Sequence, residues 1–248
     1  EELFVEIMKI KMYTQGHDTN LLKEVDNDGG RFTAEEHAYV VKKEFGETTY
    51  KTKELLVRKF LSANAKKLDC LPFLIDHINV SGYKNILSLG AGQCVLEYLL
   101  EKSLSEESEL IATDFDGFLC EKAKEFFPQL IVEKFDFVKG DFKSFLTKLD
   151  IPVDLVIFIG SAYVLDDHEL IKLFSDLNKS GVKQIIDFHA GYLSMKSQVS
   201  MGCLPFLTKN TTVRKLFRKP QLDSSGYRGK FHGYGRSRGE IKKLYKKS

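Results

Sequence analysis

From residue 84 onward, short apolar runs alternate with amphipathic segments along the chain. The apolar runs predict five strands, which span residues 85–89, 110–113, 134–139, 153–159 and 182–188. Between them, apolar residues recur at helical spacing, and this predicts helices over about 94–102, 116–127, 142–148 and 167–179. Strands that alternate with helices through short connections predict an α/β fold, with a mostly parallel sheet covered on both faces.

The two ends of the chain have other patterns. Residues 1–80 are more polar, and the segment 34–74 carries apolar residues at helical spacing, so we expect a helical extension or cap there. Residues 81–248 would then form the α/β domain. Near its end, two predicted strands flank Ser237-Arg238-Gly239, and the glycine favours a tight turn, so the sheet should finish in an antiparallel hairpin.

Composition sets the broad class of protein. Hydrophobic residues make up 43% of the 248 residues and charged residues 29%, which suits a folded domain with a sizeable core. No apolar run is long enough for a membrane-spanning helix, and Glu1-Glu2-Leu3-Phe4 lacks the basic start of a signal peptide. We expect a cytoplasmic protein with reduced thiols, because the cysteines are widely spaced and form no CxxC pair: Cys70, Cys94, Cys120 and Cys203.

The positive charge is concentrated at one end. Residues 205–248 hold thirteen Lys and Arg against two acidic residues, although the whole chain carries only +2. Aromatic residues are interleaved with these cations, so the segment could grip phosphates and stack bases of a nucleic acid. The alternative is a solvated basic edge of the hairpin, where such charges discourage aggregation between strands. We favour the second interpretation, but nucleic-acid binding stays open.

The central motif is Gly90-Ala91-Gly92, at the point where the first predicted strand turns into a helix. Two glycines let the backbone approach a ligand closely, and the start of the helix offers unpaired N–H groups. Asp114 follows 24 residues after Gly90, at the end of the second strand, where a carboxylate can accept hydrogen bonds from a nucleotide ribose. The third glycine of a dinucleotide-binding motif is absent, which disfavours a pyrophosphate ligand.

With these motifs, the sequence resembles the class I S-adenosylmethionine-dependent methyltransferases over residues 84–190. The resemblance implies a Rossmann-like, seven-stranded, mostly parallel sheet, with S-adenosylmethionine bound by the domain 81–248. It implies that Gly90, Ala91 and Gly92 pass under the amino-acid part of the cofactor, that Asp114 holds the ribose and that Phe115 lies beside the adenine.

Two further motifs carry the same resemblance. Gly140-Asp141-Phe142 is similar to the family's third motif, so Asp141 and Phe142 are implied near the adenine. Ile159-Gly160-Ser161 is similar to the loop after the fourth strand, so Gly160 and Ser161 are implied near the sulfonium and the acceptor. The chain departs from the family at Ser88, where an acid is frequent, and at Cys94, where glycine is frequent, which puts one cofactor contact in doubt.

The general base and the acceptor are less specified. His189 follows the fifth strand and Tyr163 the fourth, so both are candidate catalytic residues at the carboxyl edge of the sheet. We expect no metal, because Asp167 fits a helix cap better than a metal ligand. The acceptor loop lacks the motifs of DNA-base methylation, so a small molecule or a sugar, methylated on O or N, is preferred.

One alternative enzyme class starts from the same region. Asp114-Phe115-Asp116-Gly117 also resembles the nucleophile motif of haloacid-dehalogenase-like phosphatases, in which the first aspartate attacks phosphate and the second acts as the acid. Phe118 departs from that motif, and the glycine loop upstream would have no role. Asp116 is more simply interpreted as the cap of the following helix.

Overall fold

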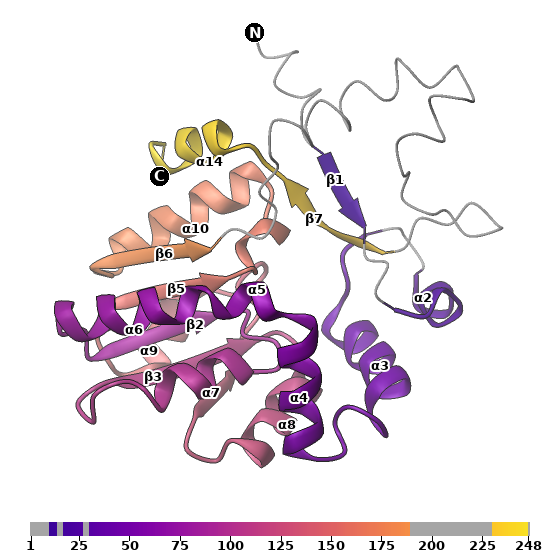
Figure 1. Ribbon diagram of the computed structural model, residues 1–248. Coiled ribbons are helices and arrows are strands. Elements are labelled where there is room, and N and C mark those ends of the chain that lie inside the picture. The colour runs from indigo at the N-terminus through magenta and orange to yellow at the C-terminus, as the bar shows by residue number, and fades with distance from the viewer. Residues whose placement is uncertain (1–9, 14–16, 27–29, 189–229, 248) are drawn as a thin grey trace, which may run out of the picture. The chain divides into compact units, whose positions relative to one another are not determined.

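The computed structural model describes residues 10–13, 17–26, 30–188 and 230–247 of the chain (Figure 1). The chain forms two compact units. Residues 34–162 and 172–190 make up one, here called the sheet unit, and residues 1–33, 163–171 and 191–248 make up the other, here called the terminal unit. These units do not follow the boundary expected at residue 80, which stays a prediction.

Five parallel strands form the centre of the sheet unit, in the order β4-β3-β2-β5-β6. Their bounds are β2 (Asn85–Leu89), β3 (Glu109–Asp114), β4 (Ile131–Lys134), β5 (Leu155–Ile159) and β6 (Gln184–Phe188). The predicted parallel α/β sheet is therefore confirmed, but the predicted seven strands are not: in the described part of the chain this sheet has five.

Helices pack on both faces of this sheet. Their bounds are α3 (Ala34–Phe45), α4 (Lys53–Ala63), α5 (Ala65–Leu68), α6 (Cys70–Ser81), α7 (Val95–Glu101), α8 (Gly117–Phe126), α9 (Phe142–Leu149) and α10 (Asp167–Lys179). One hydrophobic cluster joins α4, α6, α7 and α8 to one face, including Ile86 and Ile157. On the other face Phe158 of β5 meets Phe174 of α10, with ring centroids 5.9 Å apart.

The local sequence explains most of these elements. All five residues of β5 are buried and apolar, and burying each such side chain contributes about 1.5–3 kcal/mol. β4 lies earlier than predicted, at Ile131–Lys134 instead of 134–139. The reason is a turn: Asp136 Oδ1 accepts hydrogen bonds from the backbone N–H groups of Val138 and Lys139, which takes these residues out of the strand.

The terminal unit is built on a separate two-stranded sheet. β1 (Ile10–Tyr13) pairs antiparallel with β7 (Phe231–Gly235), and α2 (Thr19–Val25) and α14 (Arg238–Tyr245) flank it in sequence. The predicted C-terminal hairpin is wrong. Ser237 caps α14 in a capping box with Glu240, so residues 238–245 are helical and β7 finds its partner at the other end of the chain.

Ion pairs connect distant segments of the terminal unit. Lys230 is fully buried, and its Nζ lies 3.1 Å from Asp26 Oδ1. Arg31 donates two hydrogen bonds to Glu169, at 2.7 and 2.6 Å. Arg236, which is 3% exposed, binds Asp167 and the carbonyl of Leu165. These pairs join three parts of the chain that lie far apart in the sequence.

None of the helices described in these ranges is both long and apolar enough to cross a bilayer. Cys70, Cys94 and Cys120 are buried, and none of these three forms a disulfide; Cys203 lies outside the described residues.

Candidate functional site

The candidate site lies where the order of the strands reverses. From β2 the chain moves outward through β3 to β4, and it then returns to the other side of β2 to form β5 and β6. In open α/β sheets such a reversal leaves a crevice outside the carboxyl ends of the two central strands, and ligands bind there. The glycine turn follows β2, and Gly160-Ser161 follows β5, so both motifs lie at this point.

The backbone at these strand ends is left-handed. Gly90, Gly92 and Gly160 have φ angles of +72°, +58° and +71°. The two glycines of the turn differ in their surroundings. A Cβ on Gly90 would lie 2.6 Å from Ser161 Cβ, whereas a Cβ on Gly92 would meet no atom within 4 Å. Packing within the protein therefore requires Gly90, and the space beside Gly92 is open.

Asp114 is bonded directly to the glycine turn. Its Oδ2 accepts the N–H of Gly92 at 2.8 Å, and its Oδ1 accepts the N–H of Asp116 at 2.9 Å. The N–H of Ala91 donates to the carbonyl of Thr113, also at 2.8 Å. The side chain is only 5% exposed, and burial raises the pKa of Asp114 more than its donors lower it. A carboxylate has about four lone-pair sites, so it can accept further hydrogen bonds from a ligand.

Asp116 is a buried helix cap. Its Oδ1 accepts the N–H groups of Phe118 and Leu119 at the start of α8, as the sequence predicted. The opposite oxygen lies 2.5 Å from His37 Nδ1, which donates because a carboxylate only accepts. The His37 ring also lies beside Phe115, with centroids 5.2 Å apart. No local pattern predicted this pairing, because 79 residues separate His37 from Asp116.

A second contact joins the segment after α3 to the turn. Gln93 Nε2 donates to the hydroxyl of Tyr50 at 2.7 Å. Tyr50 is 3% exposed, and burial raises its pKa to about 12, so it is a neutral phenol at physiological pH. His37 and Tyr50 therefore bring the chain before β2 to the carboxyl edge of the sheet, beside Asp116 and Gln93.

Ser161 fixes the loop after β5 to the end of β2. Its hydroxyl donates to the carbonyl of Leu89 at 2.5 Å, and the side chain is buried. The N–H of Gly160 donates to the carbonyl of Phe188 at the end of β6. The structure thus brings Gly160 and Ser161 to the glycine turn; their role toward a ligand stays a prediction.

Asp141 and Phe142 have other contacts. Asp141 caps α9 by accepting hydrogen bonds from Lys143 and Ser144, and the Ser144 hydroxyl bond contributes most to lowering its pKa. Phe142 packs in an aromatic cluster with Phe135 and Phe145. In the described ranges, the structure gives neither residue a contact with the glycine turn, so their place beside an adenine remains a prediction.

The described structure tests neither of the two candidate bases. His189 lies outside the described residues. Tyr163 belongs to the terminal unit, where its ring lies against Gly233, and burial raises its pKa to about 12. With that pKa the hydroxyl would be a proton donor at neutral pH, so its role as a base stays a prediction.

Glu97 is a buried carboxylate that the sequence analysis missed. It lies in the first turn of α7, is 2% exposed and accepts a hydrogen bond from the Ser88 hydroxyl at 2.8 Å. Burial raises its pKa to about 7. Its spacing from Leu100 was an available signal, because a charged residue three positions before a core leucine lies on the apolar face of the helix.

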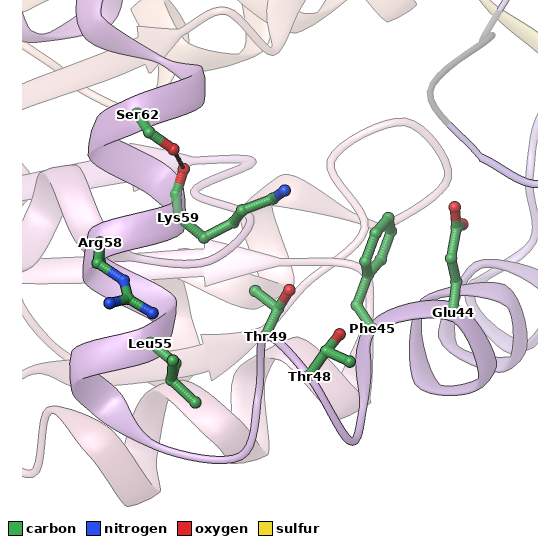
Figure 2. A pocket seen from close by; sticks show the side chains of 8 residues that line it. All are labelled: Glu44, Phe45, Thr48, Thr49, Leu55, Arg58, Lys59 and Ser62. Carbon is green, nitrogen blue, oxygen red and sulfur yellow. Dashed lines mark hydrogen bonds between the residues drawn. The ribbon is translucent and has the colours of Figure 1, made fainter.

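A pocket of about 340 Å³ lies between the end of α3 and α4 (Figure 2). Figure 2 shows Lys59 extended toward Phe45, with Arg58 on the side of Leu55. Its lining residues are Glu44, Phe45, Thr48, Thr49, Leu55, Arg58, Lys59 and Ser62. None of the predicted site residues is among them. No group of three or more His, Cys, Asp or Glu in the described ranges could hold a metal ion.

Comparison with known proteins gives only distant likenesses. No family model matches the sequence, and no curated protein matches it. Among solved structures, the chain is similar to the PH0226 protein from Pyrococcus horikoshii, with 17% identity over 83% of this chain and 87% of that chain and a TM-score of 0.49.

Two other similar structures are described as methyltransferases. The mitomycin 7-O-methyltransferase MmcR shares 14% identity over 93% of this chain and 60% of its own, with a TM-score of 0.46. An amino pentose methyltransferase from Micromonospora echinaspora, solved with S-adenosylmethionine bound, shares 11% identity over 45% of each chain, with a TM-score of 0.36. The match thus spans less than two thirds of both enzymes. All three TM-scores lie below 0.5.

Proposed function

We propose that this chain is an S-adenosylmethionine-dependent methyltransferase of class I. The observation that carries the proposal is the direct bond between the glycine turn after β2 and the carboxylate after β3, at the reversal point of the sheet. The open space at Gly92 lets the protein backbone approach a ligand closely. The adjacent Asp114 can accept hydrogen bonds from the two hydroxyls of a ribose.

The charge around the turn supports the same ligand. Glu97, Asp114 and Asp116 are 2%, 5% and 0% exposed, so three carboxylates are buried around one turn. Such a surrounding disfavours the phosphates of a dinucleotide and favours a ligand with cationic groups. S-adenosylmethionine has such groups and carries no phosphate.

The division of labour follows from this chemistry. S-adenosylmethionine, when bound, supplies a methyl group already activated as a sulfonium. The chain then has to bind and orient: Gly90, Ala91 and Gly92 carry the amino-acid part, Asp114 the ribose and Phe115 one side of the adenine. Gly160 and Ser161 face the reacting centre. If the acceptor must lose a proton, His189 removes it, which adds typically ~10²–10⁴-fold to the rate. Tyr163, the second candidate catalytic residue, is a neutral phenol at pH 7 and acts by donating a hydrogen bond.

The proposed acceptor is a small molecule or a sugar, methylated on oxygen or nitrogen. Support comes from two cations of the basic C-terminal segment, Lys230 and Arg236. Both are buried in ion pairs, so neither belongs to a surface that could grip nucleic-acid phosphates. Asp116 in turn caps α8 and binds His37, which favours a structural role for this residue over that of the acid in a phosphatase motif.

The test is ligand-dependent thermal stability. S-adenosylmethionine and S-adenosylhomocysteine should each raise the free energy of unfolding by about 2.7 kcal/mol at a hundredfold excess over Kd, and so raise the Tm. Asp114→Ala should abolish this response, whereas the control Asp176→Ala, at a partly exposed position on α10, should keep it. Absence of any shift with either ligand for the wild-type protein would overturn the proposal.

A further inference from the structure

Glu97 carries a buried oxygen with no hydrogen-bond partner. Its Oε1 accepts the Ser88 hydroxyl, but its Oε2 is enclosed by the protein and accepts no hydrogen bond within the described part of the chain. Leaving a buried acceptor unsatisfied costs about 1–3 kcal/mol, and more for a charged group. A leucine or methionine at this position would avoid that cost, so the retained carboxylate needs an explanation beyond packing.

A buried network links Glu97 to the glycine turn. Ser88, which donates to Glu97, accepts the Thr113 hydroxyl on its own carbonyl at 3.0 Å. The carbonyl of Thr113 in turn accepts the N–H of Ala91 in the turn. Glu97 and the turn therefore share one chain of hydrogen bonds, and a charge on Glu97 is felt at the turn through a medium from which water is excluded.

Titratable groups from neighbouring segments face Glu97. Lys67 of α5 lowers the pKa of Glu97, and Asp114 at the end of β3 raises it. Two buried thiols, Cys70 at the start of α6 and Cys94 before α7, have their own pKa values raised by burial first and then by Glu97. Burial outweighs Lys67, so the carboxyl is close to half-protonated near neutral pH and a nearby cation can shift it.

We infer that Glu97 is a positioning residue whose negative charge acts through this buried network to favour the ammonium group of the ligand's amino-acid part at the glycine turn, so that binding and loss of the Glu97 proton are linked. The inference rests on the proposed function. The proton leaves the Glu97 carboxyl for solvent when the ammonium arrives, and no covalent bond changes. The affinity for the ligand therefore rises with pH as Glu97 ionises.

The experiment compares two ligands that differ in this group. S-adenosylhomocysteine carries the ammonium group, whereas 5′-methylthioadenosine has the same nucleoside and lacks the amino-acid part. Titration calorimetry from about pH 5.5 to about pH 7.5, in two buffers of different ionisation enthalpy, gives affinity and proton release together. We expect about a tenfold rise in affinity and net proton release for S-adenosylhomocysteine, and neither for 5′-methylthioadenosine.

Variants assign the effect to one residue. Glu97→Gln keeps the size of the side chain and should remove the pH dependence and the proton release, whereas Glu97→Asp should keep part of both. Glu101→Gln on the same helix is the matched control and should behave as wild type. Circular dichroism checks that each variant folds. If Glu97→Gln does not fold, the pH dependence of the two ligands on the wild-type protein still tests the inference.

The outcomes separate this inference from the proposed function. If neither ligand binds, the proposed function fails. If both bind and the affinity for S-adenosylhomocysteine is flat with pH, or both ligands show the same slope, the function stands and the role of Glu97 is wrong.

Discussion

The two units of this protein are stabilised in different ways. In the sheet unit, consecutive segments bury apolar side chains from four helices against one face of the sheet, so many residues each contribute a little. In the terminal unit, segments from both ends of the chain meet through ion pairs, and Lys230 is fully buried in one of them. The comparison teaches that single charges decide the stability of the terminal unit, whereas space and backbone conformation decide that of the sheet unit.

The largest expected effect breaks the buried pair of the terminal unit. Asp26→Asn leaves the Lys230 ammonium buried without its carboxylate, which should cost about 3–5 kcal/mol in the free energy of local unfolding. Hydrogen exchange should show the loss in β1 and β7. The exposed pair Lys172–Asp176 is the control, and Asp176→Asn should cost no more than about 0.5 kcal/mol. An Asp26→Asn cost as small as the control's would contradict the comparison.

The second prediction concerns space in the sheet unit. Gly90→Ala puts a Cβ 2.6 Å from Ser161 Cβ on a backbone with φ +72°, and should cost about 2–4 kcal/mol. Gly92→Ala is the matched control, because it has a similar φ and open space, and should cost about 1 kcal/mol. Urea denaturation measures both. Equal costs for the two variants would mean that Ser161 does not restrict Gly90.

The third prediction concerns the buried carboxyl of Glu97 in the sheet unit. The folded pKa of Glu97 is about 7 and the ordinary value is 4.5, so the folded state binds the extra proton between these values. Stability should therefore fall as pH rises from about 4.5 through about 7, by on the order of 2–3 kcal/mol. Glu97→Gln should remove this fall. Urea denaturation of the wild type and of Glu97→Gln, without ligand, gives the free energy of unfolding of each at several pH values. If the two proteins show the same dependence of this free energy on pH, the prediction is contradicted.

The smallest expected effect concerns Glu169, whose contribution to stability changes with pH in the direction opposite to that of Glu97. Burial raises the pKa of Glu169, but the bonds from Arg31 and from the Asp166 N–H outweigh it, so its folded pKa lies below the ordinary value. This contribution is complete at neutral pH and is lost as pH falls through the folded pKa. Arg31→Gln should remove the larger part of it, while the Asp166 N–H still donates to Glu169. Because both side chains are partly exposed, we expect a cost of about 1 kcal/mol at pH 7. Hydrogen-exchange protection of β1 and β7, measured as the pH is lowered, tests this prediction. An acid midpoint that is the same in Arg31→Gln as in the wild type would refute it.

The same contrast explains what the sequence could predict. The runs at 85–89 and 155–159 are continuous and apolar, so local pattern alone predicted β2 and β5, and the glycine turn with Asp114 followed from their ends. β7 pairs with β1 more than 200 residues earlier, and no local pattern encodes that partner. The hairpin prediction followed Gly239 and overlooked the capping box of Ser237 and Glu240, which was visible in the sequence.

The site was predicted in part, for a similar reason. Strand ends and turns are local, so the neighbourhood of Gly92 and Asp114 could be inferred. The contacts of His37 with Asp116 and of Tyr50 with Gln93 depend on how α3 and the segment after it pack, and the isolation of Glu97 Oε2 depends on the packing of α7. Such long-range contacts are set by tertiary packing, which a local sequence pattern does not encode.

The contrast between Gly90 and Gly92 has an evolutionary consequence. The side chain of Ser161 excludes a larger residue at the first position, whereas at the second no atom of the described chain lies within reach and the proposed ligand would exclude one. A descendant that lost the ligand would keep Gly90 for as long as it kept Ser161, while Gly92 would drift first to Asn or Asp, which tolerate its backbone. Under the proposed function, the second glycine in divergent copies of this gene should therefore record whether the ligand is still bound.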